Sequence, residues 1–332
     1  LGTMSAVGTA LGPTLGGVLI AGFGWRAIFL ASVPLGLLTL ALAHGFLPAG
    51  TARPKGGQAG FDIIGTVLLA LTLGSYALAV TVGRGSFGAL NLSLLLAAMA
   101  GIGLFVLAEA RVAAPLVRPE MFRNPVLSAG LATSVLVLTV AMATLVVGPF
   151  YLSRALGLAP ATVGLVMSAG PVFSALSGVP AGRLVDRLGA PAMSAAGLVA
   201  MATGSVALAM LPASFGVAGY VAALAILTPG YQLFQAANNT TVMTDVQPDQ
   251  RGVVSGLLNL SRNLGGMTGA SVMGAVFAVA AGVTDISAAH PDEVTRGMQA
   301  TFLVSALLVA AALVIAVGGR ALAVRRAADL KA

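Results

Sequence analysis

Apolar residues gather in ten long runs along the chain, and short polar stretches separate these runs. A helix needs about 20 apolar residues to cross the hydrocarbon core of a bilayer, and each run comes close to that length. Backbone N–H and C=O groups in lipid must find partners within their own segment, so the runs predict helices. We expect spans at 1–22, 27–47, 62–83, 90–108, 126–152, 160–182, 191–212, 216–243, 252–281 and 298–318.

Composition supports an all-α, polytopic helical membrane protein. The chain is 58% hydrophobic and only 8% charged, which a water-soluble globule does not tolerate. The alternating pattern of a membrane β-barrel is absent. There is no cysteine, and the two histidines, His44 and His290, lie far apart, so we expect no metal site and no cofactor. We also expect no enzyme activity, because no nucleophile and base and no phosphate-binding loop can be recognised.

The basic residues predict the orientation of the chain. With the C-terminus in the cytoplasm, the inner segments hold twelve of the 17 Lys and Arg residues and the outer segments hold four. Arg262 alone lies within a span. The net charge of +7 is therefore explained by the topology of the chain, and we expect no nucleic-acid partner. We expect the protein in the plasma (inner) membrane.

A glycine-rich string in the first expected span carries the strongest motif. Its glycines form one ridge of small residues along the helix, and a helix-bending proline lies beside them. The same pattern is also typical of a generic packing face between membrane helices. Its residues are Gly8, Gly12, Pro13, Gly16 and Gly17. Together with the Trp25-Arg26 pair and Val33-Pro34-Leu35-Gly36, this string resembles the antiporter motif of the major facilitator superfamily, in particular its fourteen-span drug:proton antiporters.

The resemblance implies a division of the chain. Residues 1–47 would be the last two helices of an N-terminal bundle, 62–108 an extra two-helix hairpin, and 126–318 a six-helix C-terminal bundle. Cytoplasmic linkers at 48–61 and 109–125 and a tail at 319–332 would complete it. The chain has ten expected spans, whereas the transporters it resembles have fourteen. The resemblance therefore implies a major facilitator fold that lacks its first four spans here, and we expect four further spans before Leu1. A weak repeat between Leu11–Gly17 and Leu264–Ala270 is typical of the paired halves of transporters.

A second motif is expected in a tight inner loop between spans six and seven. It resembles the loop signature of the superfamily, although Ala190 and Pro191 stand where basic residues usually follow. We interpret it as a latch that closes the inner side, and the alternative is a charged turn that follows the positive-inside rule. Its residues are Gly182, Arg183, Asp186, Arg187 and Gly189.

Polar residues in spans eight and nine form the candidate substrate cavity. An arginine within a span costs about 2.5–3.5 kcal/mol on insertion scales, so Arg262 needs polar surroundings. It shares one helical face with Ser255, Asn259, Gly266 and Gly269, and that face is not expected to point at lipid. Arg262 is either a cavity residue or a tie that holds two spans together. The candidate cavity residues are Thr228, Tyr231, Gln232, Gln235, Asn238, Asn239, Asn259 and Arg262.

The resemblance implies efflux of drugs or toxic small molecules by alternating access, with protons as the coupling ion and a small amphiphilic substrate. All ten acids fall in loops or at span edges, so a proton-carrying acid is expected in spans outside this sequence. Asp62 is expected to cap its helix. Export of an endogenous metabolite or amino acid, or a non-transporting truncated membrane protein, stays open as an alternative, and the sequence gives no oligomeric state.

Overall fold

The computed structural model describes residues 26–46, 62–82, 88–112, 115–244, 246–282 and 289–329. Every element in this part of the chain is a helix, which confirms the all-α fold. The elements are α2 (Arg26–Phe46), α3 (Ile63–Thr81), α4 (Ala89–Glu109), η1 (Pro119–Arg123), α5 (Pro125–Phe150), η2 (Tyr151–Ala155), α6 (Pro160–Met167), α7 (Ala169–Leu188), α8 (Ala190–Ala209), η3 (Ala213–Phe215), α9 (Gly216–Met243), α10 (Arg251–Ala281) and α11 (Pro291–Asp329). Nine membrane-length apolar segments are found in the described part, and the expected span at 1–22 lies outside it.

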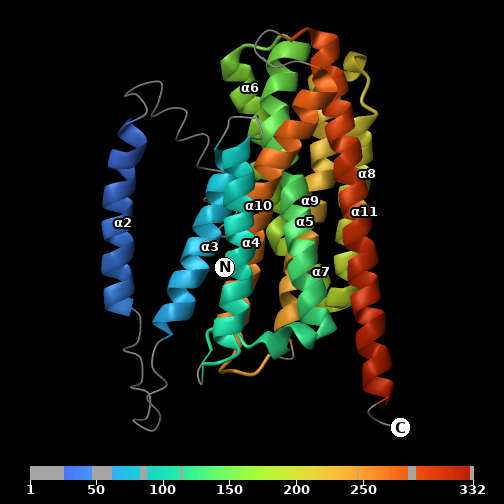
Figure 1. Cartoon of the computed structure of the whole chain (residues 1–332). Coiled ribbons are helices and arrows are strands. Elements are labelled where there is room, and N and C mark those ends of the chain that lie inside the picture. Colours follow the sequence, from blue (N-terminus) through green and yellow to red (C-terminus); the bar gives the residue numbers. More distant parts are fainter. Residues whose placement is uncertain are drawn as a thin grey trace.

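Helices α5 to α11 form one bundle, with the α3–α4 hairpin beside α10 and α2 further out (Figure 1). Glycines allow the closest approaches within the bundle. Gly197 of α8 faces α9 so closely that a Cβ there would lie 2.5 Å from the backbone N of Phe234. Gly269 of α10 lies against Thr139 of α5 in the same way. Small residues, rather than large apolar ones, therefore set the spacing of these helices.

The expected span at 160–182 is broken into two helices, α6 and α7, at Ser168. Pro171 explains the break, because proline has no N–H to donate and its ring clashes with the carbonyl four residues earlier. The N–H of Ser168 closes α6 by bonding to Gly164 O at 3.1 Å, and the N–H of Val172 opens α7 by bonding to Ser168 O at 3.1 Å. The expected span therefore lies where it was predicted, but it consists of two helices instead of one.

The last helix is much longer than the expected span at 298–318, because α11 runs for 39 residues. Its first turn carries Asp292 and Glu293, which suit the positive end of a helix dipole. The N–H of His290 donates to Glu293 Oε2 at 2.8 Å and fixes the start. The apolar pattern predicted only the part that needs lipid, whereas the helix continues at both ends among charged residues.

Most arginines of the described residues lie at the end of the bundle where α5 begins and α7 and α9 end, which is the lower end in Figure 1. This end will be called the basic end. Its arginines are Arg111, Arg118, Arg123, Arg183, Arg187, Arg251, Arg320, Arg325 and Arg326. The opposite end has Arg154 beside α5 and Arg296 in the first turns of α11. The distribution predicted for the loops thus holds for the helix ends of the structure.

Candidate functional site

Arg262 lies in the middle of α10 and is half-buried. Its Nη2 donates a short hydrogen bond to Oδ1 of Asn239 on α9. Beside this pair, Tyr231 and Gln235 of α9 line a small cavity of about 10 Å³ together with Arg262. That volume is close to what one water molecule needs. A charged group at mid-helix is therefore held by an amide and a small polar space, as insertion costs require.

Two of the predicted cavity residues form bonds between helices. Asn238 is 5% exposed, and its Nδ2 donates to Gly130 O at 3.1 Å and to Ser134 Oγ at 2.9 Å, both on α5. Gln232 is also buried, and its Nε2 donates to Ser174 O of α7 at 3.3 Å. These amides therefore hold α9 against α5 and α7. In membrane proteins such bonds contribute about 0.6 kcal/mol each.

The remaining two predicted cavity residues are not part of this cluster. Thr228 is half-buried, one turn from Tyr231 and Gln232 on α9. Asn259 is exposed, as is Ser255 on the same face of α10, whereas Gly269 at the other end of that face is buried against α5. The face predicted from the spacing is thus open at the basic end and covered at the other, with Arg262 at the transition.

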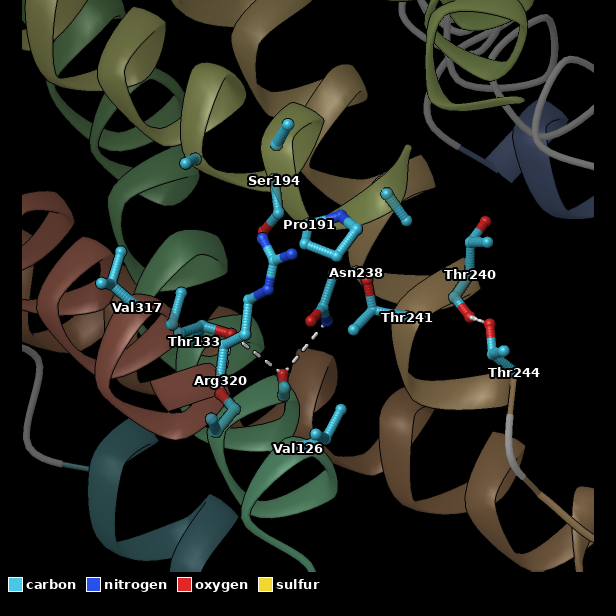
Figure 2. A pocket seen from close by; sticks show the side chains of 16 residues that line it. Val126, Thr133, Pro191, Ser194, Asn238, Thr240, Thr241, Thr244, Val317 and Arg320 are labelled. Carbon is cyan, nitrogen blue, oxygen red and sulfur yellow. Dashed lines mark hydrogen bonds between the residues drawn. The ribbon is translucent and has the colours of Figure 1, made fainter. Parts of the chain in front are cut away.

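A larger pocket of about 550 Å³ lies at the basic end, enclosed by α5, α8, α9 and α11 (Figure 2). Sequence reasoning missed it, although Thr240, Thr241 and Thr244 lie close together at the end of α9. The side chain of Arg320 points into this pocket on the side of Ser194. Its lining residues are Val126, Ala129, Gly130, Thr133, Ala190, Pro191, Ala192, Ser194, Ala195, Asn238, Thr240, Thr241, Thr244, Ala316, Val317 and Arg320.

Asn238 lines both the larger pocket and the small cavity beside Arg262. Its two hydrogen bonds to α5 hold its amide between the larger pocket and the small cavity. The hydroxyl of Thr241, one turn further along α9, is buried without a hydrogen-bond partner. The pocket therefore offers a free polar group in a mostly apolar wall, which is the usual composition of a small-molecule site.

The expected latch motif is not in a loop, and that placement is wrong. Gly182, Arg183, Asp186 and Arg187 belong to the last turns of α7, and only Gly189 lies between α7 and α8. Gly189 has φ +86, a conformation that favours glycine, and Pro191 stands in the first turn of α8. One glycine is enough for the turn, so the charged residues stay helical. In the described part of the chain, the side chain of Asp186 makes no hydrogen bond or ion pair.

The glycine-rich string at Gly8, Gly12, Pro13, Gly16 and Gly17 lies outside the described residues, as does Trp25. Its role as a packing ridge stays a prediction. The structure therefore bears on the candidate site through α9 and α10 and not through the first span.

Membrane-length helices, a mid-helix arginine held by a neighbouring amide and a pocket inside the bundle define the class: a polytopic helical membrane protein. Comparison with known proteins gives the family. The chain matches the Major Facilitator Superfamily over residues 1–270 and again over 129–327, and it belongs to this superfamily.

Several curated proteins are similar to the chain. Uncharacterized transporter YebQ of Escherichia coli (strain K12) is 33% identical over 272 residues, which cover 81% of this chain and 58% of YebQ. Riboflavin transporter RibZ of Clostridioides difficile (strain 630) is 28% identical over 83% of this chain and 59% of its own length. Multidrug resistance protein Stp of Mycobacterium tuberculosis (strain ATCC 25618 / H37Rv) is 28% identical over 91% of this chain and 56% of its own.

The chain thus spans less than two thirds of the length of each of these relatives. The resemblance inferred from the motifs, to the major facilitator superfamily and its drug transporters, is confirmed. The relatives carry different substrates in their names, so substrate and coupling ion are matters for a proposal.

Proposed function

We infer that this chain is part of a secondary active transporter that exports drugs or other toxic amphiphilic molecules in exchange for protons. The observation that carries this proposal is the Arg262–Asn239 pair, which places a cation and amides at mid-helix next to an open face of α10. A charge at this depth is costly, and such groups mark transport pathways in membrane proteins. Alternating access would then move α5–α11 as one bundle around the site.

The basic end is the cytoplasmic end in this proposal, with the C-terminus inside and the protein in the plasma membrane. The excess of arginines at that end supports it, because short inner segments retain basic residues. The pocket of about 550 Å³ would then face the cytoplasm and admit substrate from that side. Reporter fusions after residue 329 and in the 283–288 connection, one active only inside cells and one only outside, test this orientation directly.

The transport proposal is tested with the complete gene product in cells that lack their main efflux pumps. Arg262→Ala should lose export of ethidium, whereas Arg251→Ala, at the exposed first residue of the same helix, should retain it. Arg262→Lys should restore part of the activity if charge alone is needed. Membrane abundance is measured for every variant, and normal efflux by an abundant Arg262→Ala protein would show that Arg262 is not part of the pathway.

A second candidate function is export of an endogenous metabolite, and the similarity to a riboflavin transporter favours including it. Proteoliposomes with an imposed pH gradient separate the two candidates. Ethidium movement that collapses with an uncoupler supports proton-driven drug efflux. Movement of riboflavin without movement of ethidium would favour the metabolite exporter.

A further inference from the structure

Two acidic residues meet at the mouth of the α3–α4 hairpin. Asp62 directly precedes α3, and Glu109 is the last residue of α4, so the antiparallel hairpin brings them to the same end. Glu109 is 2% exposed, which is unusual for a glutamate. As expected, Asp62 caps its helix: its Oδ1 accepts the N–H of Gly65 at 2.8 Å. The burial of Glu109 against it was not predicted.

Each carboxyl group uses one oxygen for a backbone N–H and leaves the other unpaired. Glu109 Oε2 accepts the N–H of Val117 at 3.3 Å. The second oxygens, Asp62 Oδ2 and Glu109 Oε1, are buried and have no hydrogen-bond partner. Both lie over Gly65: a methyl group there would collide with Asp62 Oδ2 and lie 2.6 Å from Glu109 Oε1. The two free oxygens therefore face one small space with room for neither a side chain nor a large ion.

No positive charge neutralises this pair among the described residues. The α3 helix has no charged residue, and Glu109 is the only one of α4. Arg111 and Arg118 of the following segment and Arg262 of α10, which packs on α3, make no ion pair or hydrogen bond with either carboxyl. A third acidic or histidine ligand for a metal ion is also lacking in the described parts. Glu109 and Asp62 thus place two carboxyl oxygens over one glycine with no cation paired to them in the described residues, an arrangement that favours binding of a proton.

We propose that Asp62 and Glu109 form a proton-binding site, in which one proton is shared between Asp62 Oδ2 and Glu109 Oε1. The protonated oxygen donates to the other, so a single proton satisfies both unpaired atoms. The pair then joins the start of α3, the end of α4 and the backbone of Val117. Loss of the proton leaves two negative charges in contact and loosens this junction, which precedes η1 and the start of α5.

Infrared difference spectroscopy of the complete protein in lipid vesicles tests the site without any transport. On titration between about pH 4 and 9, a band from one buried protonated carboxyl should disappear as the pH rises. Glu109→Gln and Asp62→Asn should each remove this band, because both groups hold the same proton. Glu120→Gln, at an exposed acid in η1, should leave it in place.

Thermal unfolding provides the second measurement. The shared proton stabilises the folded hairpin, so wild-type stability should be highest at low pH and should fall as the proton is lost. Glu109→Gln keeps the shape and adds an amide donor for Asp62, so its stability should fall less than that of the wild type as the pH rises through this range. A band of unchanged intensity in either variant, or no pH-dependent carboxyl band in the wild type, would overturn the proposal.

Discussion

The α3–α4 hairpin and the α5–α11 bundle place their charged and amide side chains at different depths. The hairpin has its acidic pair and its buried amide near its two ends, with Asp62 and Glu109 at one and Asn91 at the other. The bundle has Arg262 and Asn238 well inside its helices. Polar groups at a span end cost little in a bilayer, whereas those near its middle are expensive. The comparison separates a region whose amide and acidic groups hold its ends from one that carries such groups at mid-helix, where the proposed function places the site.

The largest expected effect comes from the tight packing within the bundle. Gly197→Leu would force a side chain into the backbone of α9 at Phe234 and Gly230. Overpacking alone costs about 1–3 kcal/mol, and a rigid backbone leaves little room for relief. We expect the variant to be lost from the membrane fraction, measured by immunoblot. Gly74→Leu in α3 is the matched control, because no atom lies within 4 Å of its Cβ position, and it should accumulate normally.

Two buried asparagines test the difference in depth directly. Asn238→Ala would remove two hydrogen bonds to α5, and Asn91→Ala would remove those to Ala79 O and Val82 O within the hairpin. Each variant should lose about 1 kcal/mol, since each removes two hydrogen bonds of about 0.6 kcal/mol. Thermal unfolding of the purified proteins measures this loss. Efflux per molecule should fall only for Asn238→Ala, and an equal fall for Asn91→Ala would contradict the division of roles.

The smallest expected effect concerns the contact between the two regions. The hydroxyl of Tyr76 on α3 forms a short hydrogen bond with Thr268 Oγ1 on α10. Tyr76→Phe removes it at constant shape and should cost about 0.6 kcal/mol, the typical value for bonds between membrane helices. Thr268 retains its own bond to Leu264 O at 2.7 Å. A double-mutant cycle with Thr268→Val measures the coupling, and no coupling would mean that the hairpin is held by apolar packing alone.

Hydropathy predicted the helical spans well because lipid imposes one requirement on every segment. It could not locate the break at Ser168, which depends on one proline, or the extension of α11 into charged sequence. The charged motif at Arg183–Arg187 was expected in a loop because its residues are polar. They remain helical because the chain can turn at Gly189 alone.

The candidate site was predicted less completely than the fold. Helical spacing placed the amides of α9 on shared faces, and Arg262 stood out because of its cost in lipid. The hydrogen-bond partners of these residues could not be predicted from the sequence: Asn238 bonds to α5, Gln232 to α7 and Arg262 to Asn239. Burial of Glu109 depends on how the hairpin closes and on the return of the chain at Val117. Such pairings arise from tertiary packing, which periodicity within one helix does not encode.

The turn at Gly189 has a mechanical consequence. A single residue extends by at most about 3.6 Å, so α7 and α8 cannot separate at their basic ends. They can still swivel about the backbone dihedrals of this glycine, whose φ is +86. Pro191 and Ser194, just beyond it, line the pocket at this end. Widening of the pocket where α7 meets α8 therefore requires rotation about Gly189. A residue with less backbone freedom at this position would restrict that widening without changing any side chain that lines the pocket.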